Sequence, residues 1–205
     1  MRLNPLIRRV VDIAQSGRIG QITTVRAELS KLFPFDPTDR LFDLSVGGGA
    51  LLDLGVYPLH FVWDLLGKPS RMCVSGQRSP TGSDLVAALQ LSYPSGAVAQ
   101  VLTSAATDSP EAAVICGTAG WIRLEARIHR ATRFTISDGE SDETVTAEPD
   151  PGHGYHHQVA EVEQCLRAGR TESPTIPLDD TVAVLELIDQ ARAELGVVYA
   201  ADTGG

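Results

Sequence analysis

Four polar side chains occur at helical spacing in an otherwise apolar segment. They are Asp53, Tyr57, His60 and Asp64, which follow one another at intervals of four, three and four residues. In a helix, this spacing places all four on one face. A tyrosine hydroxyl beside a carboxylate and an imidazole can give or take a proton, so this polar stripe is suited to general acid–base chemistry.

The same stripe also has a purely structural interpretation. Burying a carboxylate, a phenol and an imidazole is costly unless they bond to one another or face a cavity. A satisfied polar network would lock the helix against a sheet, and periodicity alone favours this alternative because structural networks also place polar groups on one face. Pro58 lies inside the run and removes one backbone hydrogen bond, which predicts a kink.

Other motifs near the stripe point to neither a cofactor nor a metal. Gly47, Gly48 and Gly49 suggest a dinucleotide-binding loop, but the G-x-G-x-x-G pattern would need glycine where Leu52 stands, and no strand precedes it. Three histidines lie close together near the C-terminal third of the chain, namely His153, His156 and His157. No cysteine lies near them, so we expect solvated or capping histidines and no metal site.

Composition excludes several classes of partner. The chain carries 17 basic and 26 acidic residues, a formal net charge of −9, and shows no basic stripe. Nucleic acid and an anionic membrane surface are therefore not expected partners. The three cysteines form neither a disulfide framework nor a metal motif, and no signal-peptide pattern is present, so a cytoplasmic location is expected.

The elements that position the stripe follow an α+β order in a single domain over residues 1–205. The expected elements are a helix over about 4–17, a strand over 19–29, the buried motif helix over about 48–66, a meander of antiparallel strands over about 70–147, and closing helices over about 155–168 and 177–195. This order predicts a single open, mostly antiparallel sheet with helices packed on one face. Strand positions such as Val86, Ala88 and Leu102 are too apolar for the other face to be fully solvated, which predicts an interface there.

A specific sequence signature spans residues 47–59 and reads GGGALLDLGVYPL. This run closely resembles the C-terminal domain of the Gfo/Idh/MocA (glucose–fructose oxidoreductase / inositol dehydrogenase) family, nearest the branch of dimeric dihydrodiol dehydrogenases and xylose dehydrogenases. Further blocks agree in order. They are RLNP at 2–5 with SGRIG at 16–20, GTAGWI at 117–122, and a closing segment that starts with Gly154 and Tyr155, continues through CLRAG at 165–169 and ends with Pro-Leu-Asp-Asp-Thr at 177–181.

The resemblance implies a role in substrate binding. Family members are NAD- or NADP-dependent oxidoreductases, and this domain shapes a pocket for a small-molecule substrate, here a sugar, polyol or trans-dihydrodiol. Asp53 and Tyr57 correspond to the catalytic acid pair, with Tyr57 as the proton donor or acceptor. Arg2 matches a family arginine near the active site, and His60 is a candidate substrate contact only because helical spacing puts it beside Tyr57. Family members commonly dimerise sheet to sheet, so a homodimer is expected.

The family's Rossmann domain, with its glycine loop and its lysine, has no counterpart in this sequence. We therefore expect that the chain alone binds no NAD or NADP, and that it is inactive unless a separate Rossmann-domain chain supplies the cofactor. The alternative is a stand-alone binding or dimerisation module that has kept the fold without the chemistry. The retained Asp53 and Tyr57 favour an oxidoreductase ancestry.

Overall fold

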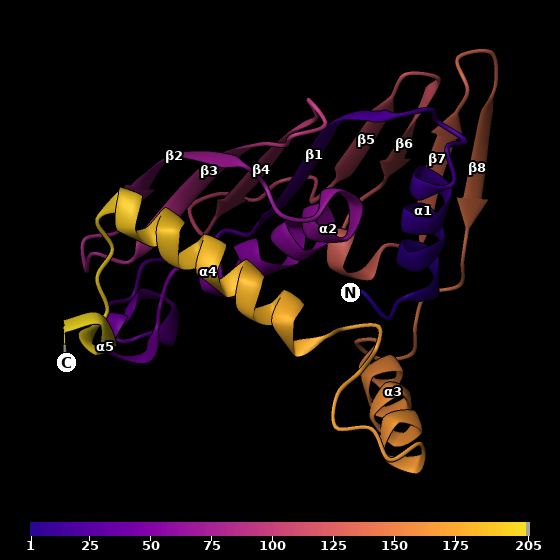
Figure 1. The fold of residues 1–205 in the computed structure, drawn as a ribbon. Helices are drawn as coiled ribbons and strands as arrows, with labels where there is room; N and C mark the ends of the chain where they lie inside the picture. The colour runs from indigo at the N-terminus through magenta and orange to yellow at the C-terminus, as the bar shows by residue number, and fades with distance from the viewer. Residues whose placement is uncertain (204–205) are drawn as a thin grey trace.

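The computed structural model describes residues 1–203, which form one open eight-stranded sheet with helices (Figure 1). The strands are β1 (Ile22–Ser30), β2 (Arg71–Arg78), β3 (Asp84–Ser92), β4 (Val98–Ser104), β5 (Ala113–Gly117), β6 (Gly120–Leu124), β7 (Arg133–Ser137) and β8 (Asp142–Thr146). The α-helices are α1 (Pro5–Gln15), α2 (Val56–Leu66), α3 (His156–Arg167), α4 (Leu178–Leu195) and α5 (Ala200–Thr203). The expected α+β class is confirmed.

The strand order corrects one expectation, the uninterrupted meander over 70–147. The order is β2-β3-β4-β1-β5-β6-β7-β8, so β1 lies between β4 and β5. It pairs in parallel with β4 and antiparallel with β5, whereas all other pairs are antiparallel. Val25, Ala27 and Leu29 of β1 are buried. Because β1 pairs along both edges, its backbone hydrogen-bonding groups are satisfied on both sides, which stabilises it in the middle of the sheet.

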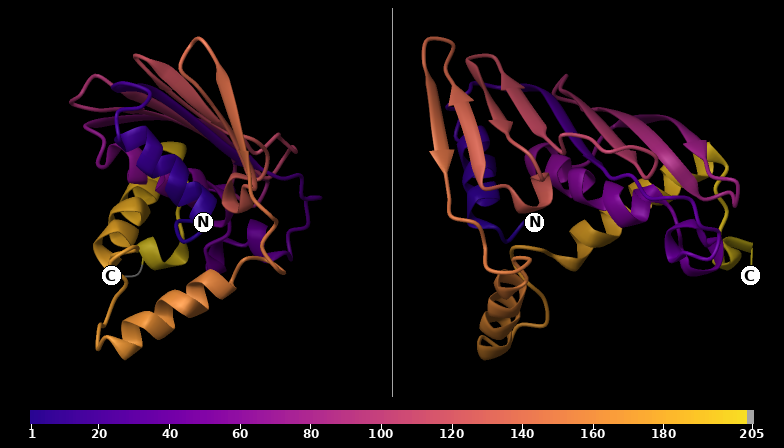
Figure 2. Two further views of the ribbon diagram at one scale, coloured as in Figure 1. Left: turned by 90° about the vertical axis from the view of Figure 1, so that its right-hand side faces the viewer. Right: turned by 180° about the vertical axis from the view of Figure 1, so that it is seen from behind.

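The helices lie on one face of the sheet, and the opposite face stays uncovered (Figure 2). Helices α1, α2 and α4 supply core side chains such as Val10, Phe61 and Ile188. Helix α3 differs, because Cys165 is its one buried residue and the helix projects away from the sheet in both views of Figure 2. None of the helices in residues 1–203 is long and apolar enough to cross a membrane.

The start of the motif helix is held by a carboxylate from the sheet. A π-helical turn over Leu51–Gly55 leads directly into α2, and Pro58 falls in the first turn of α2, where a missing N–H is best tolerated. Asp84, at the beginning of β3, is buried and accepts a hydrogen bond from the Leu51 amide at 2.6 Å. At Gly49, φ is +145° and a Cβ would collide with the Asp84 carboxylate, so this position requires glycine.

Replacing Asp84 with alanine should lower the free energy of unfolding by about 2 kcal/mol, because the buried amide at the start of the motif helix loses its acceptor. Urea unfolding followed by circular dichroism measures this loss. Asp84→Asn is the matched control: it keeps one acceptor oxygen and should lose less. An Asp84→Ala variant as stable as the wild type would contradict the capping role.

Candidate active site

The four polar residues of the motif helix separate into two groups. Asp53 pairs with Arg40, with 2.8 Å between Oδ1 and Nη2, whereas Asp64 pairs with Arg2 at 2.7 Å. Within residues 1–203, no hydrogen bond joins any two of the four side chains to each other. The polar network of the structural interpretation is therefore not formed among them.

Tyr57 opens into a pocket of about 250 Å³. Its side chain is 37% exposed, and its ring centroid lies 5.6 Å from that of His129. The other lining residues come from the first residues of the chain, from the segment after β6 and from the segment that leads into α3; they are Met1, Leu3, Asn4, Arg130, Asp150, His153, Gly154, Tyr155, His157 and Gln158. The Tyr57 hydroxyl makes no hydrogen bond within the described residues, so it is free to contact a ligand.

Electrostatics keep the proton on Tyr57. Burial raises the pKa of its phenol above the ordinary value of 10, and the nearby Tyr155 and Asp53 raise the pKa further. Burial lowers the pKa of His129 to about 4, so that imidazole is neutral at pH 7. At neutral pH the pocket therefore presents a protonated phenol beside an uncharged imidazole, which suits a proton donor.

Asp53 acts on Tyr57 through its charge and not through a hydrogen bond. It is not among the residues that line the pocket, and its carboxylate faces Arg40. The π-helical turn over Leu51–Gly55 explains this position, since it holds more residues per turn than an α-helix and shifts Asp53 away from the Tyr57 side. The structure thus brings the two members of the expected acid pair near one another without joining them.

Arg2 and His60 lie in a second cluster outside the Tyr57 pocket. The Arg2 guanidinium sits between Asp64 at 2.7 Å and Asp180 at 2.8 Å, and the Trp63 indole donates to Asp180 at 3.0 Å. Burial raises the pKa of Asp64 to about 6, although Arg2 favours its charged form. The cluster ties the first residues of the chain to α2 and α4.

His60 is a half-buried, neutral imidazole in this second cluster. Burial, with a smaller contribution from the charge of Arg2, lowers its pKa to about 4, and its Nδ1 atom is buried without a hydrogen-bond partner among the described residues. Neither His60 nor Arg2 lines the pocket of Tyr57. Their role in substrate contact remains a prediction that this arrangement does not favour.

The pocket contains residues that the sequence did not indicate, above all His129 and Asp150. His129 follows β6 in a short 3-10 turn, and Asp150 follows β8 in an irregular segment. Both come to the pocket from segments far beyond Tyr57 in the chain, and no short-range pattern in the sequence reports such a contact. Tyr155 belongs to the closing block that the sequence did single out, but nothing in the sequence indicated that it lines this pocket.

The glycine run does not fit the pyrophosphate of a dinucleotide. A Cβ at Gly48 would lie 2.6 Å from the carbonyl oxygen of Arg40 and 2.7 Å from that of Asp43, so the backbone packs against its own chain. Gly49 packs against Asp84 in the same way. These glycines serve close packing, and residues 1–203 contain no glycine loop between a strand and a helix that could hold NAD or NADP.

Comparison with known proteins identifies the family of the chain. Residues 7–123, more than half of the chain, match the family model described as GFO/IDH/MocA C-terminal domain. The chain is 31% identical over 206 residues to trans-1,2-dihydrobenzene-1,2-diol dehydrogenase of Xenopus laevis, which covers 97% of this chain and 62% of that protein. The human protein of the same name is 28% identical over 208 residues, with 98% and 62% covered. The chain thus spans less than two thirds of the length of these relatives.

Solved structures share the fold at lower identity. Aldose-aldose oxidoreductase from Caulobacter crescentus, complexed with glycerol, superposes with a TM-score of 0.81 at 22% identity, covering 95% of this chain and 59% of that one. The 3-ketoreductase KijD10 from Actinomadura kijaniata, in complex with NADP and TDP-benzene, gives 0.76 at 21% identity, covering 93% and 59%. With the family model and the sequence relatives, these observations show that the chain belongs to the Gfo/Idh/MocA oxidoreductase family through its C-terminal domain.

Proposed function

We propose that this chain is the substrate-binding part of an NAD(P)-dependent oxidoreductase that interconverts a hydroxyl and a carbonyl group on a sugar, polyol or trans-dihydrodiol. The observation that carries the proposal is the protonated, unbonded phenol of Tyr57 at the wall of a small pocket. The names of the relatives support it, since the sequence relatives are dihydrodiol dehydrogenases and two of the structural neighbours are an aldose-aldose oxidoreductase and a 3-ketoreductase.

The pocket supports a small polar substrate. Its volume of about 250 Å³ suits a molecule of few atoms, and most of its lining side chains are polar, including Asn4, His129, Asp150 and Gln158. Such side chains can donate to and accept from the hydroxyl groups of a sugar or a diol. An apolar ligand would leave these groups unpaired, so the lining favours the hydroxylated class.

Tyr57 is in the correct state to protonate a carbonyl oxygen as that group is reduced to a hydroxyl. The burial of the ring and the negative charge of Asp53 both hold the proton on the phenol until an oxygen with developing charge approaches. In the reverse direction the phenol would first have to release its own proton to solvent, and the phenolate oxygen would then receive the proton from the substrate hydroxyl. Because residues 1–203 form no nucleotide-binding loop, the redox partner must come from a separate nucleotide-binding domain.

The experiment that tests this function compares the chain alone with the chain completed by a nucleotide domain. Titration of NADH and NADPH into the isolated chain, followed by calorimetry, should give no saturable heat at micromolar concentration, because no cradle for the pyrophosphate exists among residues 1–203. Adding the nucleotide-binding domain of a dihydrodiol dehydrogenase relative should produce turnover of a sugar or dihydrodiol. Tight cofactor binding by the chain alone would contradict the proposal.

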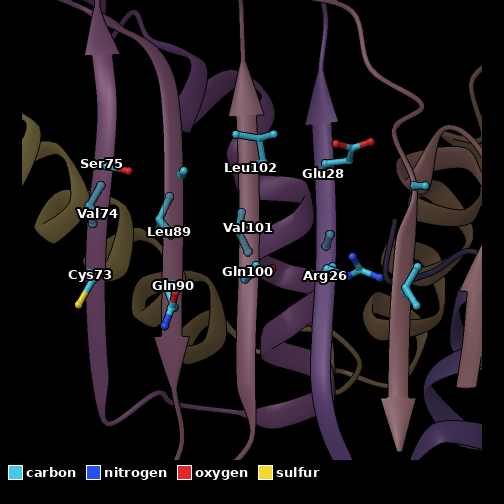
Figure 3. A pocket seen from close by; sticks show the side chains of 14 residues that line it. Arg26, Glu28, Cys73, Val74, Ser75, Leu89, Gln90, Gln100, Val101 and Leu102 are labelled. Atoms are coloured by element: carbon cyan, nitrogen blue, oxygen red, sulfur yellow. The ribbon is translucent and has the colours of Figure 1, made fainter. Parts of the chain in front are cut away.

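A stand-alone dimerisation module is the second candidate, and the uncovered face of the sheet favours it. This face carries a hollow of about 680 Å³ over β2, β3, β4 and β1, larger than the Tyr57 pocket (Figure 3). In the complementation experiment, a module without chemistry would self-associate but give no turnover with any added nucleotide domain.

We further propose that this outer face binds a second copy of the chain. Figure 3 shows Gln90, Gln100 and Arg26 in one row across the strands, with Leu102 and Glu28 in the next row. Within residues 1–203, neither Arg26 nor Glu28 has an ion-pair partner. Because the two opposite charges are two residues apart on one face, a two-fold axis between them would place Arg26 opposite Glu28 of the partner subunit.

A further inference from the structure

Three side chains at the edge of the Tyr57 pocket converge on one point. The Nε2 atom of His157 lies 2.9 Å from Oδ1 of Asp150, and Nε2 of His156 lies 3.8 Å from the same oxygen. All three atoms lie within 4.8 Å of one another. The two imidazole rings of these neighbouring residues lie with their centroids 4.0 Å apart and their planes tilted by 41°.

These distances agree with those between the ligands of a tetrahedral metal ion. Zinc binds histidine nitrogen at about 2.0–2.1 Å and carboxylate oxygen at about 2.0–2.2 Å, which separates neighbouring ligand atoms by roughly 3.3 Å. The observed 2.9 Å and 3.8 Å lie on either side of that value, so small side-chain rotations would complete the geometry. Two imidazoles with one carboxylate form a ligand set that suits zinc, cobalt or nickel and not magnesium.

Neighbouring residues orient the Asp150 carboxylate and leave the three-residue group accessible to an ion. Asn4 donates from its amide nitrogen to Oδ2 of Asp150 at 3.0 Å, which orients the carboxylate and leaves Oδ1 to the histidines. The His156 side chain is 47% exposed, so solvent reaches the site. The nearby Arg130 is directed to Nδ1 of His153 at 3.0 Å, outside the three-ligand group, and its charge opposes a cation only at longer range.

We propose that Asp150, His156 and His157 form a binding site for a divalent transition-metal ion, with zinc as the expected ion. Three protein ligands leave one coordination position open, and because Asp150 and His157 line the Tyr57 pocket, that position lies at the pocket wall. The ion also links α3, which buries only Cys165, to Asn4 at the start of the chain. This inference reverses the expectation from sequence, where the spacing of the histidines indicated no metal.

Calorimetric titration with zinc chloride tests the site on an untagged chain freed of metal by a chelator. The background variant Cys73→Ser removes the exposed thiol, which could bind zinc by itself. One saturable site per chain is expected, and His157→Gln and Asp150→Asn should each weaken zinc binding at least about 10-fold. Hydrogen exchange of residues 150–167 should slow when zinc is added, because the ion fastens α3 to the rest of the domain.

His153→Gln is the matched control, since this histidine is in the same segment but outside the ligand group. It should leave zinc affinity unchanged, and magnesium chloride should give no saturable heat. The proposal is overturned if the Cys73→Ser chain shows no saturable zinc binding, if His153→Gln weakens binding as much as His157→Gln, or if magnesium binds equally well. None of these results depends on turnover, so the metal site and the proposed oxidoreductase function are tested separately.

Discussion

Replacing Tyr57 with phenylalanine should lower the kcat of the complemented enzyme by about 100-fold or more, which is the usual scale for the loss of a general acid–base group. The substitution removes one hydroxyl that makes no hydrogen bond within residues 1–203, from a side chain that is 37% exposed. The fold and the pocket wall should therefore remain intact. Steady-state kinetics measures the loss, and thermal unfolding should show an unchanged midpoint.

A second tyrosine in the same pocket supplies the control for this prediction. Tyr155 lines the pocket but is 64% exposed, and it lies in the irregular segment just before α3. Because a side chain this open to solvent is poorly fixed relative to a bound substrate, Tyr155→Phe should change kcat far less than Tyr57→Phe. Equal losses for both variants, or an unchanged kcat for Tyr57→Phe, would assign Tyr57 a structural role.

Asp53→Asn separates the electrostatic contribution from the proton transfer itself. If the charge of Asp53 helps to keep the proton on Tyr57, its removal should lower the phenol pKa without removing the donor. The loss in kcat should then be smaller than for Tyr57→Phe. The ion pair with Arg40 gives Asp53 a second, structural role on the loop before the motif helix.

Secondary structure was predictable where a segment carries its own signals. Asn4 caps α1 by accepting hydrogen bonds from the amides of Leu6 and Ile7, and α1 ends within two residues of the expected boundary. Such signals act over a few residues and need no knowledge of the partner.

Strand pairing was not predictable in the same way. The alternation of β1 shows which of its faces is buried, but not that β4 and β5 are its neighbours. The pairs of Ala27 with Val101 and with Ala113 join residues far apart in the chain. A sequence pattern with a period of two fixes the face of a strand and leaves its neighbours open.

The candidate site could also be predicted only in part, because sequence patterns do not report contacts between distant segments. Helical spacing placed Asp53 and Tyr57 on one stripe, but the π-helical turn before Val56 breaks the period, and Asp53 turns to Arg40. The pocket itself is closed by His129 and Asp150, which come from separate segments beyond the motif helix. The motif thus pointed to Tyr57, whose catalytic role stays a prediction, while the pocket around it depends on tertiary contacts.

Replacing Leu102 with arginine should convert a dimer of this chain to a monomer. Leu102 is 39% exposed at the centre of β4 on the uncovered face, beside Ala88 and Glu28 in the same row of the sheet. An arginine there would take Glu28 of its own chain as its ion-pair partner and would hold the two sheets apart. The dimer would lose both its apolar packing at this point and the pairing of Glu28 with Arg26 of the partner subunit, which should weaken it by about 100-fold. Sedimentation velocity should show a species near twice 21.9 kDa for the wild type and one near 21.9 kDa for Leu102→Arg.

Charge exchange at the same face tests how the two copies are arranged. Arg26→Glu and Glu28→Arg should each weaken the dimer, because each single change places like charges across the two-fold axis. The double variant restores opposite charges and should restore association, a result that a nonspecific apolar contact would not produce. Val162→Arg on α3, where the side chain is 57% exposed, is the control on another surface. It should leave the dimer intact. A wild-type monomer at micromolar concentration would contradict pairing through the sheet.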